Sequence, residues 1–431
     1  MSLRPFFELD PRAYAGATVI VDVDGTLTHD KGEPDAAALE KLKRLGEIAN
    51  VHLCSNGANG RVQTLAQEAG VSAIDSIHRK PSRRVLEKLV HEGTRLVVIG
   101  DKALTDGLFA LNIGAEFVPV ARLRHAGDTR LIRSTYMLDD AAAVFVRILF
   151  PVLPYVILMR PFQWIKNLLV IAPIFFAGEV LEPAVFVRSL LAVLVFCAVS
   201  SAMYVFNDIR DAARDRLHPS KRYRPVASFA VPEWHAWILL GSLLAVSAVL
   251  LSLVAPIWPI MLAYVTGNIL YSTYLKHVAV LDLASVAFFY VLRILAGGAA
   301  TATFVSPWII LCVLFGALFL VIGKRRAEFS HTAKRAVLHL YSQSALDYLL
   351  AIAATLTLTS YGLYSVLGDR SPYAVYSTFF VFIVIFRLLN RMYRSDGDAE
   401  YPESLVFKDR WALLTSFFWV VFMFILFYLK P

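Results

Sequence analysis

From about residue 141 onward, the chain consists mostly of apolar runs close to twenty residues long, separated by charged residues, proline or glycine. A helix needs about 20 mostly apolar residues to cross the hydrocarbon layer of a bilayer. Nine runs approach that length, near residues 161–178, 184–206, 234–254, 257–275, 279–299, 306–323, 345–366, 372–390 and 411–429. The second part of the chain is therefore predicted to be an all-α membrane domain of about nine transmembrane helices.

The apolar segment before the first run is interrupted by Arg147, Pro151 and Pro154. These interruptions favour a helix at the membrane interface over residues 141–159, with a tenth span as the alternative. We therefore expect a soluble domain at residues 1–130, a linker with the interfacial helix at 131–159, and the membrane domain at 160–431.

Lysines and arginines are concentrated in alternate connections between the runs. The basic connections contain Arg210, Arg214, Arg216, Lys221, Arg222, Arg224, Lys276, Lys324, Arg325, Arg326, Lys334, Arg335, Arg391, Arg394, Lys408 and Arg410. The other connections contain Arg188, Arg370 and the terminal Lys430. Because basic loops are retained on the cytoplasmic side, the N-terminal part is expected in the cytoplasm and the C-terminus outside an inner (plasma) membrane.

The composition excludes a single soluble enzyme. The chain is 57% hydrophobic and 18% charged, whereas soluble domains contain about 25% charged residues. The net charge is +8, and the basic residues cluster between the apolar runs. This distribution argues against a nucleic-acid partner and fits a lipid bilayer. The three cysteines are too far apart to indicate a disulfide framework, and the N-terminus lacks the pattern of a secretory signal. The sequence leaves open whether the chain forms a homo-oligomer.

The first 130 residues alternate short apolar runs with amphipathic segments. The runs TVIVDVDG, NVHLCSNG, RLVVIGD and AEFVPV have the pattern of buried parallel strands, so an α/β doubly wound domain is predicted. In such sheets, functional side chains gather at the carboxyl ends of the strands. Five polar residues occupy these positions, namely Asp22, Asp24, Ser55, Asn56 and Asp101.

Asp22 and Asp24, followed by Gly25 and Thr26, form a DxDGT sequence. This sequence resembles the signature of the haloacid dehalogenase-like phosphohydrolases. The later motifs of that family match in order as Ser55, Lys80 in HRKP, and Asp101 with Asp106 in GDKALTD. The short connections leave little room for a cap domain, so a site with a minimal cap, open to a large or membrane-held substrate, is expected.

The resemblance implies roles for these residues. Asp22 would attack phosphorus, Asp24 would act as general acid and then base, and Ser55, Asn56 and Lys80 would hold the phosphate. Mg²⁺ would be bound by Asp22, Asp24 and Asp101, with Asp24 contributing its carbonyl oxygen. On the alternative interpretation the aspartates, Asp106 above all, only cap helices, and Lys80 is a surface lysine.

The segment NDIRDAARDRLHPSKRYRP, residues 207–225, combines acidic and basic residues at the end of a predicted span. On a helix, Asp208, Asp211 and Asp215 share one face beside Asn207. Three carboxylates on one face repel each other unless a cation is present, which suits Mg²⁺ carrying a diphosphate. The basic residues that follow, Lys221, Arg222 and Arg224, can donate to phosphate oxygens. A solvated loop that only sets topology would explain the basic residues but not the aspartates.

This NDxxDxxxD segment resembles the first aspartate motif of the UbiA-type intramembrane prenyltransferases. Its ending, HPxKRxRP, is similar to the branch that makes phosphoribosyl decaprenyl phosphate from phosphoribosyl diphosphate and a polyprenyl (decaprenyl) phosphate. Further matches are RPFQWIKN, YSTYLKHVAVLD, RILAGG and GKRRAE. The second acidic motif of the family departs from its pattern, because Asp282 is followed at the fourth position by Val286.

The resemblance implies Asp208 and Asp211 as catalytic residues, with Asp215 as a further metal ligand. Candidate substrate-binding residues are Arg160, Lys166, Asn207, Lys221, Arg222, Arg224, Tyr271, Lys276, Lys324 and Arg325. Arg160 and Lys166 could equally be snorkelling anchors at the membrane surface. Arg293, in the middle of a predicted span, needs a partner, and Asp282 is one candidate. Glu328 is either a ligand or an ion-pair partner of Arg325.

Together these motifs predict a bifunctional membrane enzyme that transfers phosphoribose to polyprenyl phosphate and then removes the 5-phosphate. One alternative is a prenyltransferase acting on an aromatic or other acceptor, fused to an unrelated phosphatase. Another is a soluble domain with only a regulatory or docking role. A P-type pump is disfavoured, because Asp24 would promote hydrolysis of its phosphoenzyme and no nucleotide-binding insertion is present.

Overall fold

The computed structural model describes residues 3–29, 34–56, 59–74, 76, 78–86, 95–123, 134, 136–141, 143, 151–218, 221–329, 340–368, 371–394, 407 and 409–429. Its contacts divide the chain into two compact units. One comprises residues 1–160 and 204–241, and the other comprises residues 161–203 and 242–431. The long helix α7 (Pro183–Arg216) belongs to both units, so the domain boundaries expected from the sequence remain a prediction.

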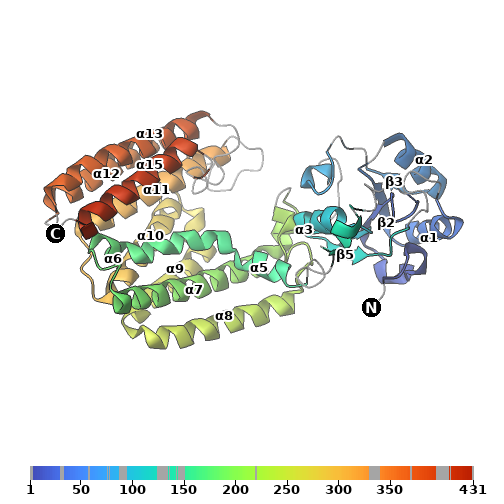
Figure 1. Ribbon diagram of the computed structural model, residues 1–431, viewed down its shortest axis with the longest axis horizontal. Helices are drawn as coiled ribbons and strands as arrows, with labels where there is room; N and C mark the ends of the chain where they lie inside the picture. Colours follow the sequence, from blue (N-terminus) through green and yellow to red (C-terminus); the bar gives the residue numbers. More distant parts are fainter. Residues whose placement is uncertain are drawn as a thin grey trace. The chain divides into compact units, whose positions relative to one another are not determined.

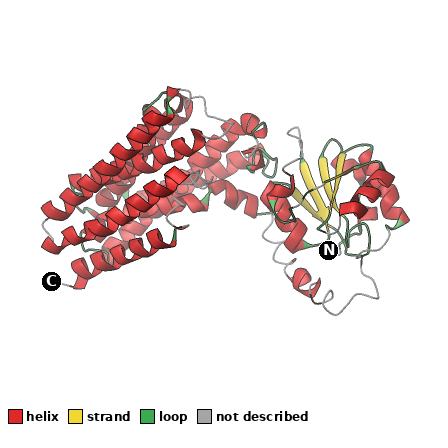
Figure 2. Cartoon of the chain, turned by 90° about the horizontal axis from the view of Figure 1, so that it is seen from above, coloured by secondary structure: helices red, strands yellow, loops and turns green. Residues whose placement is uncertain are grey.

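The N-terminal region contains a five-stranded parallel sheet with the strand order β3-β2-β1-β4-β5. The strands are β1 (Thr18–Asp22), β2 (Asn50–Cys54), β3 (Ser72–Ala73), β4 (Leu96–Gly100) and β5 (Glu116–Pro119). Figure 2 shows these strands with helices on either side. The predicted parallel sheet is confirmed, and the chain crosses from one side of β1 to the other between β3 and β4.

Helices cover both faces of the sheet, which explains why its strands are continuously apolar. Val19 and Val21 on β1 pack toward α1 (Ala36–Gly46) and α2 (Asn59–Ala69). Ile20, between them, packs on the other face with residues of α3 (Leu108–Ile113). The alternation follows from the two-residue period of a strand.

Short helical turns complete the N-terminal region. They are η1 (Phe6–Glu8), η2 (Pro11–Tyr14), η3 (Arg83–Leu86) and η4 (Ala103–Gly107). Residues 136–141 are also helical and follow the sheet in the chain. They lie in the predicted linker, between the sheet and the first apolar helix.

The described residues of the remaining chain form helices joined by short connections (Figure 1). Its elements are α5 (Leu153–Met159), η5 (Pro161–Ile171), α6 (Ala172–Phe176), α7, η6 (Lys221–Tyr223), α8 (Glu233–Leu253), η7 (Ala255–Ile257), α9 (Trp258–Thr273), η8 (Leu275–His277), α10 (Leu281–Thr301), α11 (Pro307–Phe329), α12 (Gln343–Leu367), η10 (Pro372–Ser377), α13 (Thr378–Arg394), α15 (Arg410–Phe424) and η12 (Ile425–Leu429). Helix α11 packs along α12 and against α10, and α13 packs against α15.

Seven helical segments in the described part of the chain are long and apolar enough to cross a membrane. They coincide with seven of the nine predicted runs. The other two runs form shorter helices, α9 with 16 residues and the segment Pro161–Phe176. Within the predicted interfacial helix, residues 141 and 143 and the helix α5 are helical, and residues 144–150 lie outside the described residues. The number of spans and their orientation therefore remain predictions.

Gly297 of the RILAGG motif allows a close contact between α10 and η5. A Cβ atom on Gly297 would lie 2.0 Å from the carbonyl oxygen of Val170, which is far inside contact distance. Backbone atoms cannot yield as a flexible side chain can, so only glycine fits at this position. The motif thus fixes the packing of two segments that are more than a hundred residues apart in the chain.

We expect Gly297→Ala to lower the melting temperature of the detergent-solubilised protein clearly, since overpacking typically costs about 1–3 kcal/mol. Gly241→Ala on α8 is the matched control, because a Cβ there meets nothing within 4 Å. That substitution should leave stability unchanged or raise it by up to about 1 kcal/mol. Equal melting temperatures for wild type and Gly297→Ala would contradict the close contact.

Candidate active sites

Three buried carboxylates meet at the carboxyl edge of the parallel sheet. Asp22 ends β1, Asp101 follows β4, and Asp106 lies one turn later in η4. One oxygen atom from each lies within 4.8 Å of the others, and we call these three residues the acidic cluster. The sequence predicts Asp22 and Asp101 as metal ligands and places Asp106 in the same family motif, with a helix cap as its alternative role.

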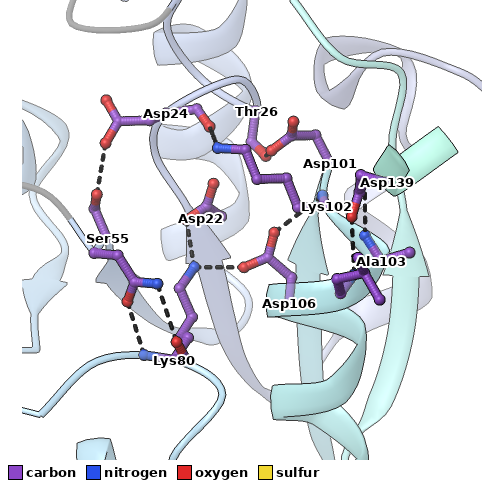
Figure 3. A network of polar contacts seen from close by, with 12 residues as sticks. Asp22, Asp24, Thr26, Ser55, Lys80, Asp101, Lys102, Ala103, Asp106 and Asp139 are labelled. Carbon is purple, nitrogen blue, oxygen red and sulfur yellow. Dashed lines mark hydrogen bonds and ion pairs between the residues drawn. The ribbon is translucent and has the colours of Figure 1, made fainter. Parts of the chain in front are cut away.

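Lys80 is buried beside the acidic cluster, so the alternative of a surface lysine is wrong. Its Nζ donates to Asp22 and, at 2.5 Å, to Asp106 (Figure 3). Burial alone would lower the pKa of Lys80, but the Asp106 and Asp22 charges outweigh it and raise that pKa. Burial and the Asp106 carboxylate raise the pKa of Asp22 to about 8, despite Lys80. Lys80 therefore pairs with two of the three carboxylates of the acidic cluster, and Arg122 pairs with the third, Asp101, at 2.5 Å.

Asp24 is oriented by two neighbours from the next strand and helix. Ser55 Oγ donates to Asp24 Oδ2 at 2.6 Å, and Arg61 Nη1 on α2 lies 3.2 Å from Asp24 Oδ1. Asn56 supports the loop that carries Lys80, because its side chain bonds the Lys80 backbone at both N–H and C=O. Ser55 and Asn56 thus position site residues, and Arg61 is a neighbour that the sequence analysis did not identify.

The acidic cluster fits a divalent cation by the chemistry of its donors. Carboxylate oxygens are the ligands that Mg²⁺ takes in proteins, and the three groups are close enough to share one ion. A cation bound there would stabilise the ionised form of Asp22, whose pKa burial raises. The Asp24 carbonyl, predicted as a further ligand, accepts from Lys102 Nζ at 3.3 Å.

A second charged group lies at the end of α7, within the first compact unit. Arg224 Nη1 lies 3.2 Å from Asp208 Oδ1 and 2.7 Å from Asp215 Oδ2, and Arg160 Nη2 lies 2.5 Å from the same Asp208 oxygen. Asp208 and Asp215 are buried, and the Arg160 guanidinium also stacks 4.9 Å from the Tyr204 ring. We call Arg160, Asp208, Asp215 and Arg224 the α7 network. Its ion pairs join residues predicted to bind metal and residues predicted to bind phosphate.

The other residues of this segment have separate contacts. Asp211 lies toward Arg214 at 3.5 Å, and the Arg222 guanidinium covers the Tyr223 ring at 4.9 Å. Arg222 Nε is buried and has no hydrogen-bond partner among the described residues. Asn207 is half-buried on α7, and Lys221 begins η6. Within the described ranges, the three aspartates of α7 do not converge as the acidic cluster does, so their role as metal ligands remains a prediction.

A third charged group lies in the second unit, where α10 begins. Arg325 Nε donates to Asp282 Oδ2 at 3.0 Å, and its Nη1 donates to Glu328 at 3.0 Å. Tyr271 accepts from Arg325 at 3.4 Å, and Tyr341 donates to Asp282 Oδ1 at 2.8 Å. We call these residues the α10 network. Glu328 is thus an ion-pair partner of Arg325, and Arg325 is held by two carboxylates. Lys276 lies in η8, and Lys324 lies on α11.

Asp282 is not the partner of Arg293, so this candidate pairing was wrong. The two residues lie on one helix, eleven positions apart, which separates them by about 16 Å along its axis. Arg293 instead donates to Asn167 at 2.8 Å, to the Phe289 carbonyl at 2.7 Å and to Tyr264 at 3.1 Å. Lys166, next to Asn167, lies 5.8 Å from the centre of the Tyr290 ring.

Long apolar helices, with buried acidic and basic side chains near their ends, define a helical membrane protein with charged sites. The chain belongs to the UbiA prenyltransferase family, whose family model matches residues 168–408. It is 36% identical to a decaprenyl-phosphate phosphoribosyltransferase of Mycolicibacterium smegmatis over 61% of this chain and 88% of the relative. The corresponding protein of Mycobacterium tuberculosis is also 36% identical, over 61% of this chain and 90% of its own length.

Among solved structures, a UbiA homolog from Archaeoglobus fulgidus bound to DMAPP and Mg²⁺ is similar to this chain. It shares 19% sequence identity, with a TM-score of 0.49, over 63% of this chain and 97% of the homolog.

Proposed function

We propose that the membrane part transfers 5-phosphoribose from phosphoribosyl diphosphate to a polyprenyl phosphate, for which decaprenyl phosphate is the model. The α7 network is the observation that carries this proposal, because it places buried carboxylates against arginines that can donate to phosphate. The similarity to decaprenyl-phosphate phosphoribosyltransferases supports the choice of substrates.

In the proposed reaction, the bond between ribose C1 and the diphosphate breaks, and the diphosphate leaves with the electron pair. An oxygen of the lipid phosphate forms the new bond to C1. This oxygen is already anionic, so no strong general base is needed. Mg²⁺ held by Asp208, with Asp211 and Asp215, would supply positive charge for the departing diphosphate. Arg160 and Arg224 would exchange their carboxylate contacts for phosphate oxygens, which explains why they lie at the same site.

The α10 network is assigned a different part in this proposal. Arg325 is engaged by Asp282 and Glu328, so we assign it to holding Tyr271 and the start of α10 in place. Lys166, Lys276 and Lys324 remain the proposed donors to the lipid phosphate or the 5-phosphate. Lys221 and Arg222, which follow α7, are proposed to hold the diphosphate.

We further propose that the N-terminal region is a haloacid dehalogenase-like phosphatase that removes the 5-phosphate from the product. Asp22 attacks phosphorus and forms an aspartyl-phosphate, while Asp24 protonates the leaving ribose oxygen. Asp24 then takes a proton from the water that hydrolyses the aspartyl-phosphate. Ser55 orients Asp24, and Lys80 offers the phosphate a buried cation. The acidic cluster would hold Mg²⁺, which would neutralise charge between Asp22 and the phosphate.

A shared chain gives the two reactions a physical connection. The phosphoribosyl lipid would be released into the bilayer that anchors the phosphatase, so tethering raises the effective concentration of the two partners. The proposal places both sites on the cytoplasmic side of the plasma membrane, as the alternating charges of the loops predict.

Mass spectrometry of the lipid product tests the proposed function. Purified protein incubated with Mg²⁺, phosphoribosyl diphosphate and decaprenyl phosphate should yield lipid-linked ribose, without its 5-phosphate. A parallel incubation with a prenyl diphosphate and an aromatic acceptor should give no product. A product in the second incubation only would replace the proposed transferase with an aromatic prenyltransferase. Lipid-linked phosphoribose in the first incubation would keep the transferase and assign the soluble domain another substrate.

A further inference from the structure

The side chain of Arg122 is buried and connects the acidic cluster to the linker. It lies three residues after β5, and its Nε donates to Asp101 Oδ2 at 2.5 Å. Its Nη2 donates to the Asp101 carbonyl at 3.2 Å and to Asp139 Oδ2 at 2.5 Å. The guanidinium also lies 4.4 Å from the centre of the Tyr136 ring. Both the backbone and the carboxylate of Asp101 are therefore fixed by one side chain.

Asp139 reaches the same site from the helical residues 136–141. Its side chain is buried and accepts from Ala103 N–H at 3.2 Å and from Leu104 N–H at 2.9 Å (Figure 3). These two amides begin η4, the turn that carries Asp106. Asp139 thus contacts Arg122 and also the backbone N–H groups at the start of the turn that carries Asp106. Through Arg122 and through η4, Asp139 connects the linker to the surroundings of two members of the acidic cluster, Asp101 and Asp106.

We propose that Arg122 and Asp139 are positioning residues for the metal held by the acidic cluster, so that the linker completes the phosphatase site. This proposal rests on the proposed phosphatase function. Groups that hydrogen-bond a metal-binding carboxylate fix its orientation, and their loss typically weakens metal affinity by about 10–100-fold. Arg122 orients Asp101 directly, and Asp139 holds Arg122 and the start of η4.

The contacts favour positioning over competition between Arg122 and the metal. A carboxylate oxygen accepts along two lone pairs, so Asp101 Oδ2 can bind a cation while it accepts from Arg122. Arg122 also serves Asp139 and lies 3.4 Å from Asp140, so its single charge is shared among three carboxylates. It therefore neutralises the acidic cluster only in part.

Manganese binding to the full-length protein in detergent tests this proposal. Mn²⁺ accepts the same oxygen ligands as Mg²⁺, and free Mn²⁺ is measured directly by electron paramagnetic resonance. The difference between the Mn²⁺ bound by wild type and the Mn²⁺ bound by Asp101→Ala measures binding at the acidic cluster. We expect Arg122→Gln and Asp139→Asn to weaken that binding by about 10–100-fold. The Mg²⁺ concentration for half-maximal dephosphorylation should rise similarly, with kcat at saturating Mg²⁺ kept within about threefold.

Arg95→Gln is the matched control, because Arg95 also pairs with a carboxylate, Glu116 on β5, away from the acidic cluster. It should leave Mn²⁺ binding unchanged. Arg122→Lys and Asp139→Glu, which keep the charges, should bind Mn²⁺ with intermediate affinity and serve if the other variants do not fold.

Three results are distinguished by these measurements. Unchanged or tighter Mn²⁺ binding in Arg122→Gln would overturn the proposal, the latter because Arg122 would then compete with the metal. Equal Mn²⁺ binding by wild type and Asp101→Ala would remove the metal site and the proposal with it. A third result combines the expected losses of Mn²⁺ affinity in the variants with a wild-type protein that does not remove the lipid 5-phosphate. This result would support the positioning roles and overturn only the proposed phosphatase substrate.

Discussion

Asp208→Asn is expected to lower the rate of the proposed phosphoribosyl transfer by at least about 10²-fold, because the variant loses the negative charge that would hold Mg²⁺ against the departing diphosphate. The substitution keeps the size of the side chain, and Arg160 and Arg224 can still donate to its amide oxygen. Initial rates of lipid-product formation from labelled phosphoribosyl diphosphate measure the effect. The loss should appear in kcat rather than in protein yield or melting temperature.

Asp347→Asn is the matched control for that variant. Asp347 also pairs with an arginine, since Arg326 Nε donates to it at 2.5 Å, but it belongs to none of the proposed sites. Transfer by Asp347→Asn should stay close to the wild-type rate. A wild-type rate in Asp208→Asn would show that the α7 network is structural and would move the search for the donor site elsewhere.

Asp22→Asn is expected to leave transfer intact and to stop removal of the 5-phosphate, with at least about a 10⁴-fold loss, as for removal of other nucleophiles. The lipid product should then carry phosphoribose instead of ribose, a change that mass spectrometry detects as one retained phosphate. An amide at position 22 cannot form the aspartyl-phosphate, although it can still accept a hydrogen bond from Lys80.

Asp35→Asn provides the control within the same region. Asp35 caps α1 by accepting from Ala37 N–H at 3.0 Å, and asparagine is an equally good cap. This variant should release lipid-linked ribose as wild type does. If Asp22→Asn also releases lipid-linked ribose, the N-terminal region does not carry out the second step.

The sequence predicted the sheet edge well, because parallel strands bring their carboxyl ends together regardless of the loops between them. This rule placed Asp22 and Asp101 correctly beside each other. It did not decide the role of Asp106, which lies a turn beyond the strand and could have been only a helix cap. Its side chain is directed to Lys80 by η4, a local geometry that the residue pattern did not specify.

The contacts that sequence reasoning missed come from tertiary packing. Arg122 lies just after β5, so the same rule about strand ends could have singled it out. Nothing in the pattern marked Asp139, which lies in the linker and meets η4 only through folding. The arithmetic of helix rise, by contrast, already excluded contact between Asp282 and Arg293 on one helix.

Helix α7 is long enough to extend from the lipid layer into water, the two environments from which the proposed reactants come. Its 34 residues extend about 51 Å, whereas the hydrocarbon layer is about 30 Å thick. A perpendicular helix starting at one boundary would leave that layer near residue 203, so Asp208 would stand about 7 Å beyond it and Asp215 about 18 Å. A water-soluble sugar diphosphate could then bind at these aspartates without entering the lipid layer. The polyprenyl tail of the acceptor would stay among the acyl chains. The length of this one continuous helix thus sets how far the sugar diphosphate must approach the bilayer and how far the lipid phosphate must extend out of it.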